Sequence, residues 1–304
     1  VLSALGPDAR FRTSVRRSGR DLVLVGGGDP LLRTPTGIDV READPRRRGF
    51  PSTSLDELAA RTAVALDGGE VDRIFVDATR HDSVTRQPDW KESYMAEGEV
   101  GRMAALAVDG GTVDPVRRRP ALDPARRAGE AFAERLREHG VEVTGPIGNA
   151  GSGPTGREIA VISSAPLATI VGEMLATSDN FTAEMLLREV AVASGAADGA
   201  TSGAGAAITR RFLQRAGVPV AGLDQRDGSG LSRTNRVRCA TLLAILERTG
   251  SPRYRPIRDG LAVAGRSGTL VDRDFGSGSD QVLRAKTGTL DGVTGLVGLF
   301  DGGR

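Results

Sequence analysis

Lysine is nearly absent from this chain of 304 residues, although the sequence is rich in positive charge. Only Lys91 and Lys286 occur, whereas lysine and arginine together number 41 against 39 acidic residues, which leaves a net charge of +2. We interpret the excess of arginine as a genomic bias. Aromatic residues make up 4% of the chain, and the arginine runs at 46–48 and 117–119 lie in proline-rich stretches typical of solvated loops. A nucleic-acid surface would need clustered basic residues and aromatic side chains that stack bases, so no nucleic-acid partner is predicted.

Cysteine and histidine are also scarce, which limits the disulfides, metal sites and catalytic triads that the chain could form. Cys239 is the single cysteine, so an internal disulfide and a thiolate metal cluster are excluded. It lies in an apolar helical pattern, and we expect its thiol to be buried. His81 and His139 lie in polar stretches without a ligand-spaced partner, so a Ser–His–Asp triad has little support and no metal or cofactor is predicted. Glycine-rich stretches complete no nucleotide-binding motif, and no apolar run approaches the ~18 residues of a membrane-spanning helix.

The chain has the composition of a soluble globular protein and is long enough for two domains. The pattern is rich in strands and turns from Phe11 to about Glu158, and helical signals strengthen from Ile159 onward. We expect Ser164 to cap a helix, and residues 193–207 to form a loop or a poorly packed start of a helix. Helices are predicted at 55–66, 125–139, 164–178, 182–192, 208–216 and 238–248, and strands at 21–25, 71–76, 159–162, 282–290 and 293–300.

Both ends of the chain fall at predicted elements. Val1–Leu5 has the pattern of the last turns of an amphipathic helix, with Gly6 suited to its C-terminal cap and Pro7 unable to continue it. At the other end, Arg304 follows soon after the predicted strand 293–300. We therefore expect the sequence to be a fragment of a longer protein, truncated at both ends.

Two short motifs carry the clearest chemistry. Ser178-Asp179-Asn180 lies between two predicted helices, where such a cluster by itself is more often helix capping than function. Lys286-Thr287-Gly288-Thr289 lies within a predicted strand, and a glycine there often marks the close approach of a ligand or another backbone. An ammonium beside two hydroxyls forms a good carboxylate receptor. The alternative for this second motif is an edge strand protected from aggregation by its lysine.

A third segment and one absence complete this set. Arg266-Ser267-Gly268-Thr269-Leu270 echoes the lysine motif, but we interpret it as a turn that leads into another element. The two motifs resemble two of the three active-site elements of penicillin-binding serine acyltransferases. The third element, Ser-x-x-Lys, is absent, because Pro88 and Leu283 stand three positions before the two lysines.

Taken in order, the landmarks resemble the D-alanyl-D-alanine carboxypeptidases and endopeptidases of peptidase family S13, the class C low-molecular-mass penicillin-binding proteins. The resemblance covers nearly the whole chain and implies an α+β fold, with an antiparallel sheet flanked by helices. It implies a penicillin-binding domain from residues 1–10 and 159–304 and a β-rich inserted domain at 11–158. The matching segments are Leu5-Gly6-Pro7-Asp8-Ala9-Arg10-Phe11, Val25-Gly26-Gly27-Gly28-Asp29-Pro30, Ser164-Ala165-Pro166-Leu167, Asp227-Gly228-Ser229-Gly230-Leu231-Ser232-Arg233, Leu261-Ala262-Val263-Ala264-Gly265 and the two motifs.

The resemblance also implies a role for each motif residue. Ser178 would relay protons and Asn180 would bind the substrate backbone, with Asp179 and Gly288 beside them in the substrate site. Lys286 would raise the positive potential near the substrate's terminal carboxylate, which Thr287 and Thr289 would bind. The Thr289 N–H would form half of the oxyanion hole, and the nucleophilic serine would precede this chain.

The function implied is serine-type D-Ala-D-Ala carboxypeptidase or endopeptidase activity on peptidoglycan stem peptides, through an acyl-serine intermediate that β-lactams trap. Such an enzyme acts outside the cytoplasm, in the periplasm or cell-wall space. Without its nucleophile, the fragment alone is expected to be inactive. Two alternatives stay open: a non-catalytic homologue that binds peptidoglycan peptides or a partner protein, and, with less support, an unrelated serine hydrolase.

Overall fold

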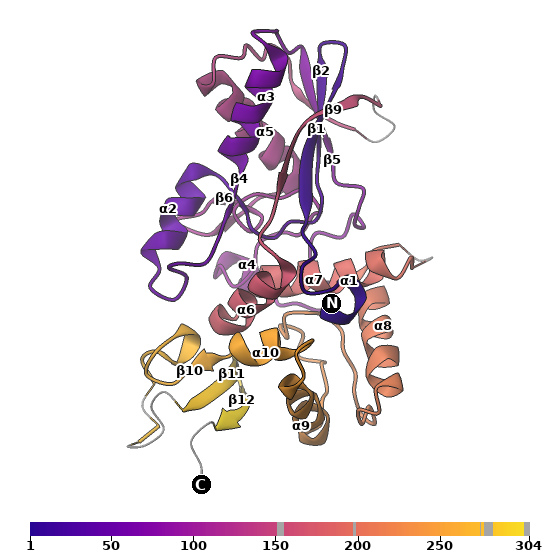
Figure 1. Cartoon of the computed structure of the whole chain (residues 1–304), viewed down its shortest axis with the longest axis vertical. Helices are drawn as coiled ribbons and strands as arrows, with labels where there is room; N and C mark the ends of the chain where they lie inside the picture. The colour runs from indigo at the N-terminus through magenta and orange to yellow at the C-terminus, as the bar shows by residue number, and fades with distance from the viewer. Residues whose placement is uncertain (151–154, 197–198, 274, 277–281, 301–304) are drawn as a thin grey trace.

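The computed structural model describes residues 1–150, 155–196, 199–273, 275–276 and 282–300. The molecule is elongated, with a five-stranded sheet at one end and most of the helices at the other (Figure 1). We call these the sheet lobe and the helical lobe. None of the helices in these ranges is long and apolar enough to cross a membrane.

The sheet lobe is built on a mixed sheet in the order β8-β5-β2-β1-β9. The pairs β1–β2 and β1–β9 are antiparallel, whereas β2–β5 and β5–β8 are parallel. Strand β9 crosses position 158, the domain boundary expected from the sequence; the division into two domains stays a prediction. The strands are β1 (Arg12–Ser18), β2 (Asp21–Val25), β5 (Arg73–Asp77), β8 (Ile147–Asn149) and β9 (Arg157–Ser163).

Two amphipathic helices cover one face of this sheet, α3 (Leu55–Leu66) and α5 (Pro124–Glu138) (Figure 1). The Ser54 hydroxyl accepts a hydrogen bond from the Glu57 N–H and so caps α3. Their apolar sides bury residues such as Leu58 and Phe132 against the strands, each contributing roughly 2 kcal/mol. Smaller elements link this core to the other lobe: β3 (Leu32–Arg33), α2 (Pro35–Ala43), β4 (Thr53–Ser54), α4 (Ser93–Ala96), β6 (Thr112–Asp114) and β7 (Arg119–Pro120).

The helical lobe also contains a three-stranded antiparallel sheet in the order β10-β11-β12 (Figure 1). Leu2, Leu167 and Ile170 belong to its buried apolar cluster. Its elements are α1 (Leu2–Leu5), α6 (Leu167–Thr177), α7 (Asn180–Ala193), α8 (Ser202–Arg215), α9 (Cys239–Glu247), η1 (Arg248–Gly250), α10 (Arg255–Asp259), β10 (Ala262–Val263), η2 (Gly268–Leu270), β11 (Leu283–Leu290) and β12 (Val293–Phe300).

Two local predictions in this lobe were wrong, and a third holds in one of its two forms. Ser164 does not cap α6; its hydroxyl accepts the Phe11 N–H instead and so fastens the end of β9 to the start of β1. Cys239 is exposed, because α9 buries only Thr241 and Leu246 against the protein. Of the two forms expected for the segment 193–207, the start of a helix is present at its end, since α8 begins at Ser202 with the Thr201 hydroxyl as its cap.

A buried polar cluster fastens the two lobes to each other. Glu189 of α7 accepts two hydrogen bonds from Arg80, at 2.8 and 2.7 Å, and lies 2.7 Å from the His81 ring. Burial alone would raise the pKa of Glu189, but these two partners hold it below its usual value. His81 is therefore a buried structural residue rather than a solvated one, and its partner lies 108 positions away.

Candidate functional site

The two motifs meet in space. The Lys286 ammonium on β11 donates a 2.7 Å hydrogen bond to the Ser178 hydroxyl and a 2.6 Å bond to the Thr287 carbonyl. Burial lowers the pKa of Lys286 to about 8. Ser178 ends α6 in the left-handed region, at φ 57°, which costs a non-glycine residue roughly 1–2 kcal/mol. Strained residues of this kind concentrate at functional sites, and here the strain presents the hydroxyl to the lysine.

Asp179 locks the turn between α6 and α7. One carboxylate oxygen accepts the Thr182 N–H at 2.8 Å and caps α7, and the other accepts a 2.8 Å hydrogen bond from Arg47. Burial would raise the pKa of Asp179, but the charges of Arg47 and Arg33 and the capped N–H hold it far below its usual value. Asp179 is therefore a fixed anion whose contacts hold the turn.

Asn180 is the first residue of α7, directly after this turn. Its side-chain amide donates a 3.0 Å hydrogen bond to the Glu99 carbonyl, which belongs to the segment that follows α4. The contact crosses 81 positions in the sequence. It fixes the plane of the amide group at the rim of the cleft.

The edge of β11 borders the cleft. β10 pairs with β11 only at Ala285 and Arg284, and the Leu283 carbonyl accepts the Ala264 N–H on that side. Backbone groups alternate in direction along a strand, so Thr287 and Thr289 turn their N–H and C=O groups toward the same side, beyond the end of β10. β11 is thus the middle strand of its sheet at one end and an open edge at the other, where the lysine motif lies.

The side chains of the lysine motif leave room for a ligand. The Thr287 hydroxyl donates a 3.0 Å hydrogen bond to the Thr269 hydroxyl, which comes from the segment that echoes the motif. A Cβ built on Gly288 would meet nothing within 4 Å. Packing therefore does not require the glycine, and its absent side chain widens the cleft.

A cavity of about 880 Å³ joins these parts, and all seven predicted site residues line it. Residues of both lobes line it, from α2 and the loops around Glu99 and Gly110 in the sheet lobe and from β11 in the helical lobe. Ser178, Asp179, Asn180, Lys286, Thr287, Gly288 and Thr289 are those seven. Within the described ranges, no three histidine, cysteine or acidic side chains gather as a metal site.

A buried carboxylate supports one wall of the cleft. Glu184 of α7 accepts the Gly228 and Ser229 N–H groups at 2.7 and 2.8 Å, so it holds the turn whose residues Ser229 and Leu231 line the cavity. Burial and the nearby charge of Asp227 raise the pKa of Glu184 to about 7. The wall therefore rests on a carboxyl group that changes charge near neutral pH.

Several of these residues were not predicted from the sequence to belong to the site. Arg47 was expected in a solvated loop; this was wrong, since its side chain pairs with Asp179 and Glu173. Thr269 lies in a turn, as predicted, but that turn also reaches Thr287. The echo of the lysine motif was the one signal that could have identified Thr269. Nothing local marked Arg47.

Comparison with known proteins yields consistent matches. The sequence model of the D-Ala-D-Ala carboxypeptidase 3 (S13) family matches residues 1–121 and 115–303. A carboxypeptidase of Mycobacterium tuberculosis is 36% identical over 99% of this chain and 65% of its own length. The carboxypeptidase DacB of Mycolicibacterium smegmatis is 35% identical over 98% of this chain and 65% of its own length. The D-alanyl-D-alanine carboxypeptidase of an Actinomadura strain is 32% identical over 89% and 49%. The chain thus spans about 65% of the length of the first two relatives.

Among solved structures, penicillin binding protein 4 from Haemophilus influenzae superimposes with a TM-score of 0.79 at 21% identity. The match covers 98% of this chain and 78% of that one. A second structure of that protein, complexed with a β-lactam, gives a TM-score of 0.71 at 20% identity. This likeness confirms the predicted α+β, penicillin-binding type of fold.

Proposed function

The chain belongs to the D-Ala-D-Ala carboxypeptidase 3 (S13) family, and on this premise we propose that it forms the substrate cleft of a serine-type D-Ala-D-Ala carboxypeptidase. The substrate is the stem peptide of peptidoglycan. The observation that carries the proposal is the contact of Lys286 with Ser178, beside an open strand edge and a vacant glycine position. This arrangement suits an extended peptide that ends in a carboxylate.

Each motif residue then has a distinct task. The peptide lies along the open edge of β11 and gains backbone hydrogen bonds there, as in strand addition. The ammonium of Lys286 attracts the terminal carboxylate, and the hydroxyls of Thr287 and Thr289 bind it through charge-assisted hydrogen bonds. Asn180 holds the peptide backbone from the opposite side of the cleft.

Ser178 moves a proton during the reaction. Its hydroxyl accepts from Lys286, so its own hydrogen is directed elsewhere in the cleft and can pass to the leaving amine, while the proton released by the attacking serine replaces it. Asp179 does not titrate with the reaction, because it stays ionised beside Arg47. It contributes by holding Ser178 and Asn180 in place.

The nucleophile comes from outside residues 1–304, because neither lysine of this chain has a serine three positions before it. The intact protein that contains this chain would attack the D-Ala-D-Ala peptide bond with that serine, form an acyl-serine and release D-alanine. The Thr289 N–H, which faces the open edge, would stabilise the oxyanion together with the N–H of the nucleophilic serine.

The same cleft would bind β-lactams; a solved structure of penicillin binding protein 4 from Haemophilus influenzae is complexed with one. Peptidoglycan lies outside the cytoplasmic membrane, so the site of action would be the periplasm or cell-wall space. We also propose that residues 1–10 and 159–304 form the penicillin-binding domain and residues 11–158 the inserted one.

The test is release of D-alanine from a synthetic stem peptide that ends in D-Ala-D-Ala, catalysed by the intact protein. We expect release from this peptide and none from the matched peptide that ends in D-Ala-L-Ala. Absence of release from both peptides, in a folded preparation, would contradict the proposed activity.

A further inference from the structure

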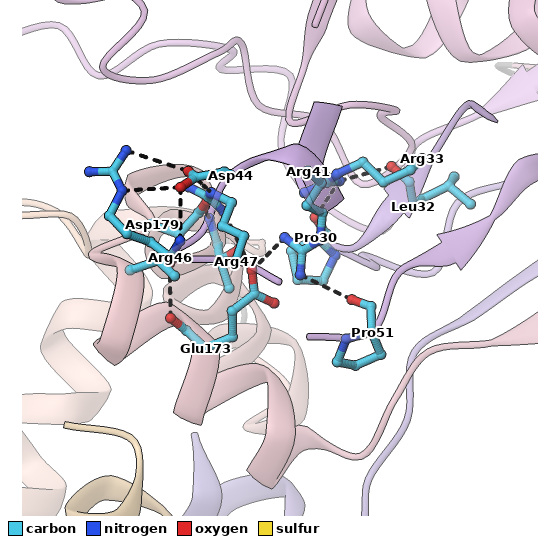
Figure 2. Close-up of polar contacts among 12 residues, drawn as sticks. Pro30, Leu32, Arg33, Arg41, Asp44, Arg46, Arg47, Pro51, Glu173 and Asp179 are labelled. Atoms are coloured by element: carbon cyan, nitrogen blue, oxygen red, sulfur yellow. Dashed lines mark hydrogen bonds and ion pairs between the residues drawn. The ribbon is translucent and has the colours of Figure 1, made fainter. Parts of the chain in front are cut away.

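Four charged side chains join the sheet lobe to the helix junction at the cleft (Figure 2). Arg41 at the end of α2 contacts Glu173 of α6, and Arg47, in the loop after α2, pairs with both Glu173 and Asp179. The distances from the Arg47 guanidinium are 3.4 Å to Glu173 and 2.8 Å to Asp179. These contacts span 126 and 132 positions in the sequence.

Asp179 is the point where this network reaches the motif. Its two carboxylate oxygens are divided between the Thr182 N–H, which it caps, and the guanidinium of Arg47. Ser178 precedes it in a strained left-handed conformation, and Asn180 follows it as the first residue of α7. The contacts of the Asp179 carboxylate therefore hold the backbone that carries both functional side chains.

We propose that Arg47 is a positioning residue, which holds the Ser178-Asp179-Asn180 turn in its productive shape from the opposite lobe. The inference rests on the proposed function of the cleft, and it adds a specific task for the sheet lobe. Arg47 reaches Asp179 with a nitrogen of its guanidinium and touches no motif residue that would react. Its effect on the chemistry must therefore pass through Asp179.

Burial increases the contribution of the Arg47–Asp179 ion pair to the stability of the turn. The side chains of Glu173, Asp179 and Arg47 are 3%, 12% and 18% exposed, so water screens their charges poorly. Removal of one partner from such a pair leaves an uncompensated charge and costs far more than loss of a surface pair. Arg46 next in sequence provides the contrast, because its side chain is 54% exposed and, among the described residues, its ion pair is with Asp44.

The pair also predicts a pH signature. The charged groups around Asp179 are Arg33, Arg41 and Arg47 from the sheet lobe, Asp44 beside Arg47, and Glu173 from α6. Without Arg47, burial and the negative charge of Glu173 would raise the pKa of Asp179. The Asp179 carboxylate would then become protonated as the pH falls, whereas in the wild type it stays ionised.

The experiment measures acylation of the intact protein by a fluorescent penicillin between pH 8 and pH 5. We expect Arg47→Gln to lower the second-order rate by roughly tenfold or more, since a displaced turn misaligns the reacting groups. The loss should grow toward pH 5. Arg47→Lys should recover part of the rate, and the matched control Arg46→Gln should stay within about twofold of the wild type.

A double-mutant comparison separates positioning from loss of folding. Asp179→Asn keeps a capping side chain but removes the charge that Arg47 meets. Arg47→Gln should therefore lower the rate in the wild-type background and change it little in the Asp179→Asn background. An equal loss in both backgrounds, or a wild-type rate and pH profile in Arg47→Gln, would overturn the proposal.

Amide hydrogen exchange in residues 1–304 tests the same claim without any chemistry. The Thr182 N–H should exchange faster in Arg47→Gln and at the wild-type rate in Arg46→Gln. Unchanged exchange in Arg47→Gln would also overturn the proposal. If the wild-type protein fails to react with penicillin, the proposed function fails, and this exchange measurement still decides whether Arg47 holds the turn.

Discussion

The ammonium of Lys286 lies 2.7 Å from the hydroxyl of Ser178, although 108 residues separate them in the sequence. The contact joins a strand of the small antiparallel sheet to the junction of two helices. It places a half-buried cation and a strained hydroxyl in one cleft, and the proposed chemistry depends on this pair.

The two lysines should titrate at clearly different pH values. The hydrogen bond and charge of Asp291 raise the pKa of Lys91, whereas burial lowers the pKa of Lys286 to about 8. Selective ¹⁵N-lysine labelling yields two signals, which Lys91→Arg assigns. We expect one to titrate near pH 8 and the other above pH 10.5, the ordinary value. Titration of both near 10.5 would show that the Lys286 ammonium is solvated.

The low pKa of Lys286 also sets a dependence of binding on pH. Folding lowers the pKa of Lys286, so burial of its ammonium destabilises the folded state. This loss in the free energy of unfolding is complete below pH 8 and disappears as the pH rises toward 10.5. Binding of the substrate carboxylate should instead weaken as the pH rises, because the Lys286 ammonium loses its charge above pH 8. Non-covalent binding of a D-Ala-D-Ala peptide to residues 1–304 should weaken above pH 8 in the wild type and not in Lys286→Met.

Substitution of Gly288 should separate binding from folding. A Cβ at this position meets nothing within 4 Å, and valine favours strands, so Gly288→Val should keep or slightly raise the free energy of unfolding. Its methyl groups would fill the cleft, and penicillin acylation of the intact protein should fall by roughly tenfold or more. Gly298→Val in the same hairpin is the contrast, because its Cβ would lie 2.1 Å from the Arg284 carbonyl oxygen and should destabilise the fold.

Glu184 should make stability depend on pH. Its folded pKa of about 7 lies above the ordinary 4.5, so its stabilising contribution is present below pH 4.5 and is lost as pH rises through 7. The total change is about 3 kcal/mol. Glu184→Gln keeps an acceptor for the Gly228 and Ser229 N–H groups without a charge, so it should gain stability relative to the wild type by that amount between pH 4 and pH 8. Denaturant unfolding measures this difference, with Glu130→Gln on the exposed side of α5 as control. A difference that does not vary with pH would contradict the raised pKa.

Cys239 should react in the native protein. Its exposure on α9 predicts rapid modification by a thiol reagent without denaturant. If Cys239 is modified only after unfolding, its thiol is buried in the native protein, as the sequence pattern predicted.

Local patterns in the sequence predicted many elements well. The helix expected at 55–66 and the strand expected at 293–300 coincide with α3 and β12, because apolar period, capping residue and turn signal agree within each segment. The two motifs and the order of landmarks indicated the fold and the cleft. Helices and strands of this kind are predictable because residues that are close in the sequence determine them.

Long-range pairings could not be predicted in the same way. Arg47 lies in a polar, arginine-rich stretch, and its partner Asp179 is 132 positions away, so only the docking of the two lobes reveals the ion pair. His81 meets Glu189 in the same manner. For Cys239 the apolar pattern was real, but periodicity cannot tell which side of a short helix the protein covers.

The central claim is that this cleft serves an acyl-serine enzyme whose nucleophile lies outside residues 1–304. The most direct measurement is covalent labelling by a fluorescent penicillin, followed by peptide mapping of the labelled residue. We predict that the intact protein is labelled at the serine of a Ser-x-x-Lys sequence, that Lys286→Ala is labelled more slowly, and that residues 1–304 alone are not labelled. Labelling of any serine within residues 1–304, or none in the folded intact protein, would contradict the account.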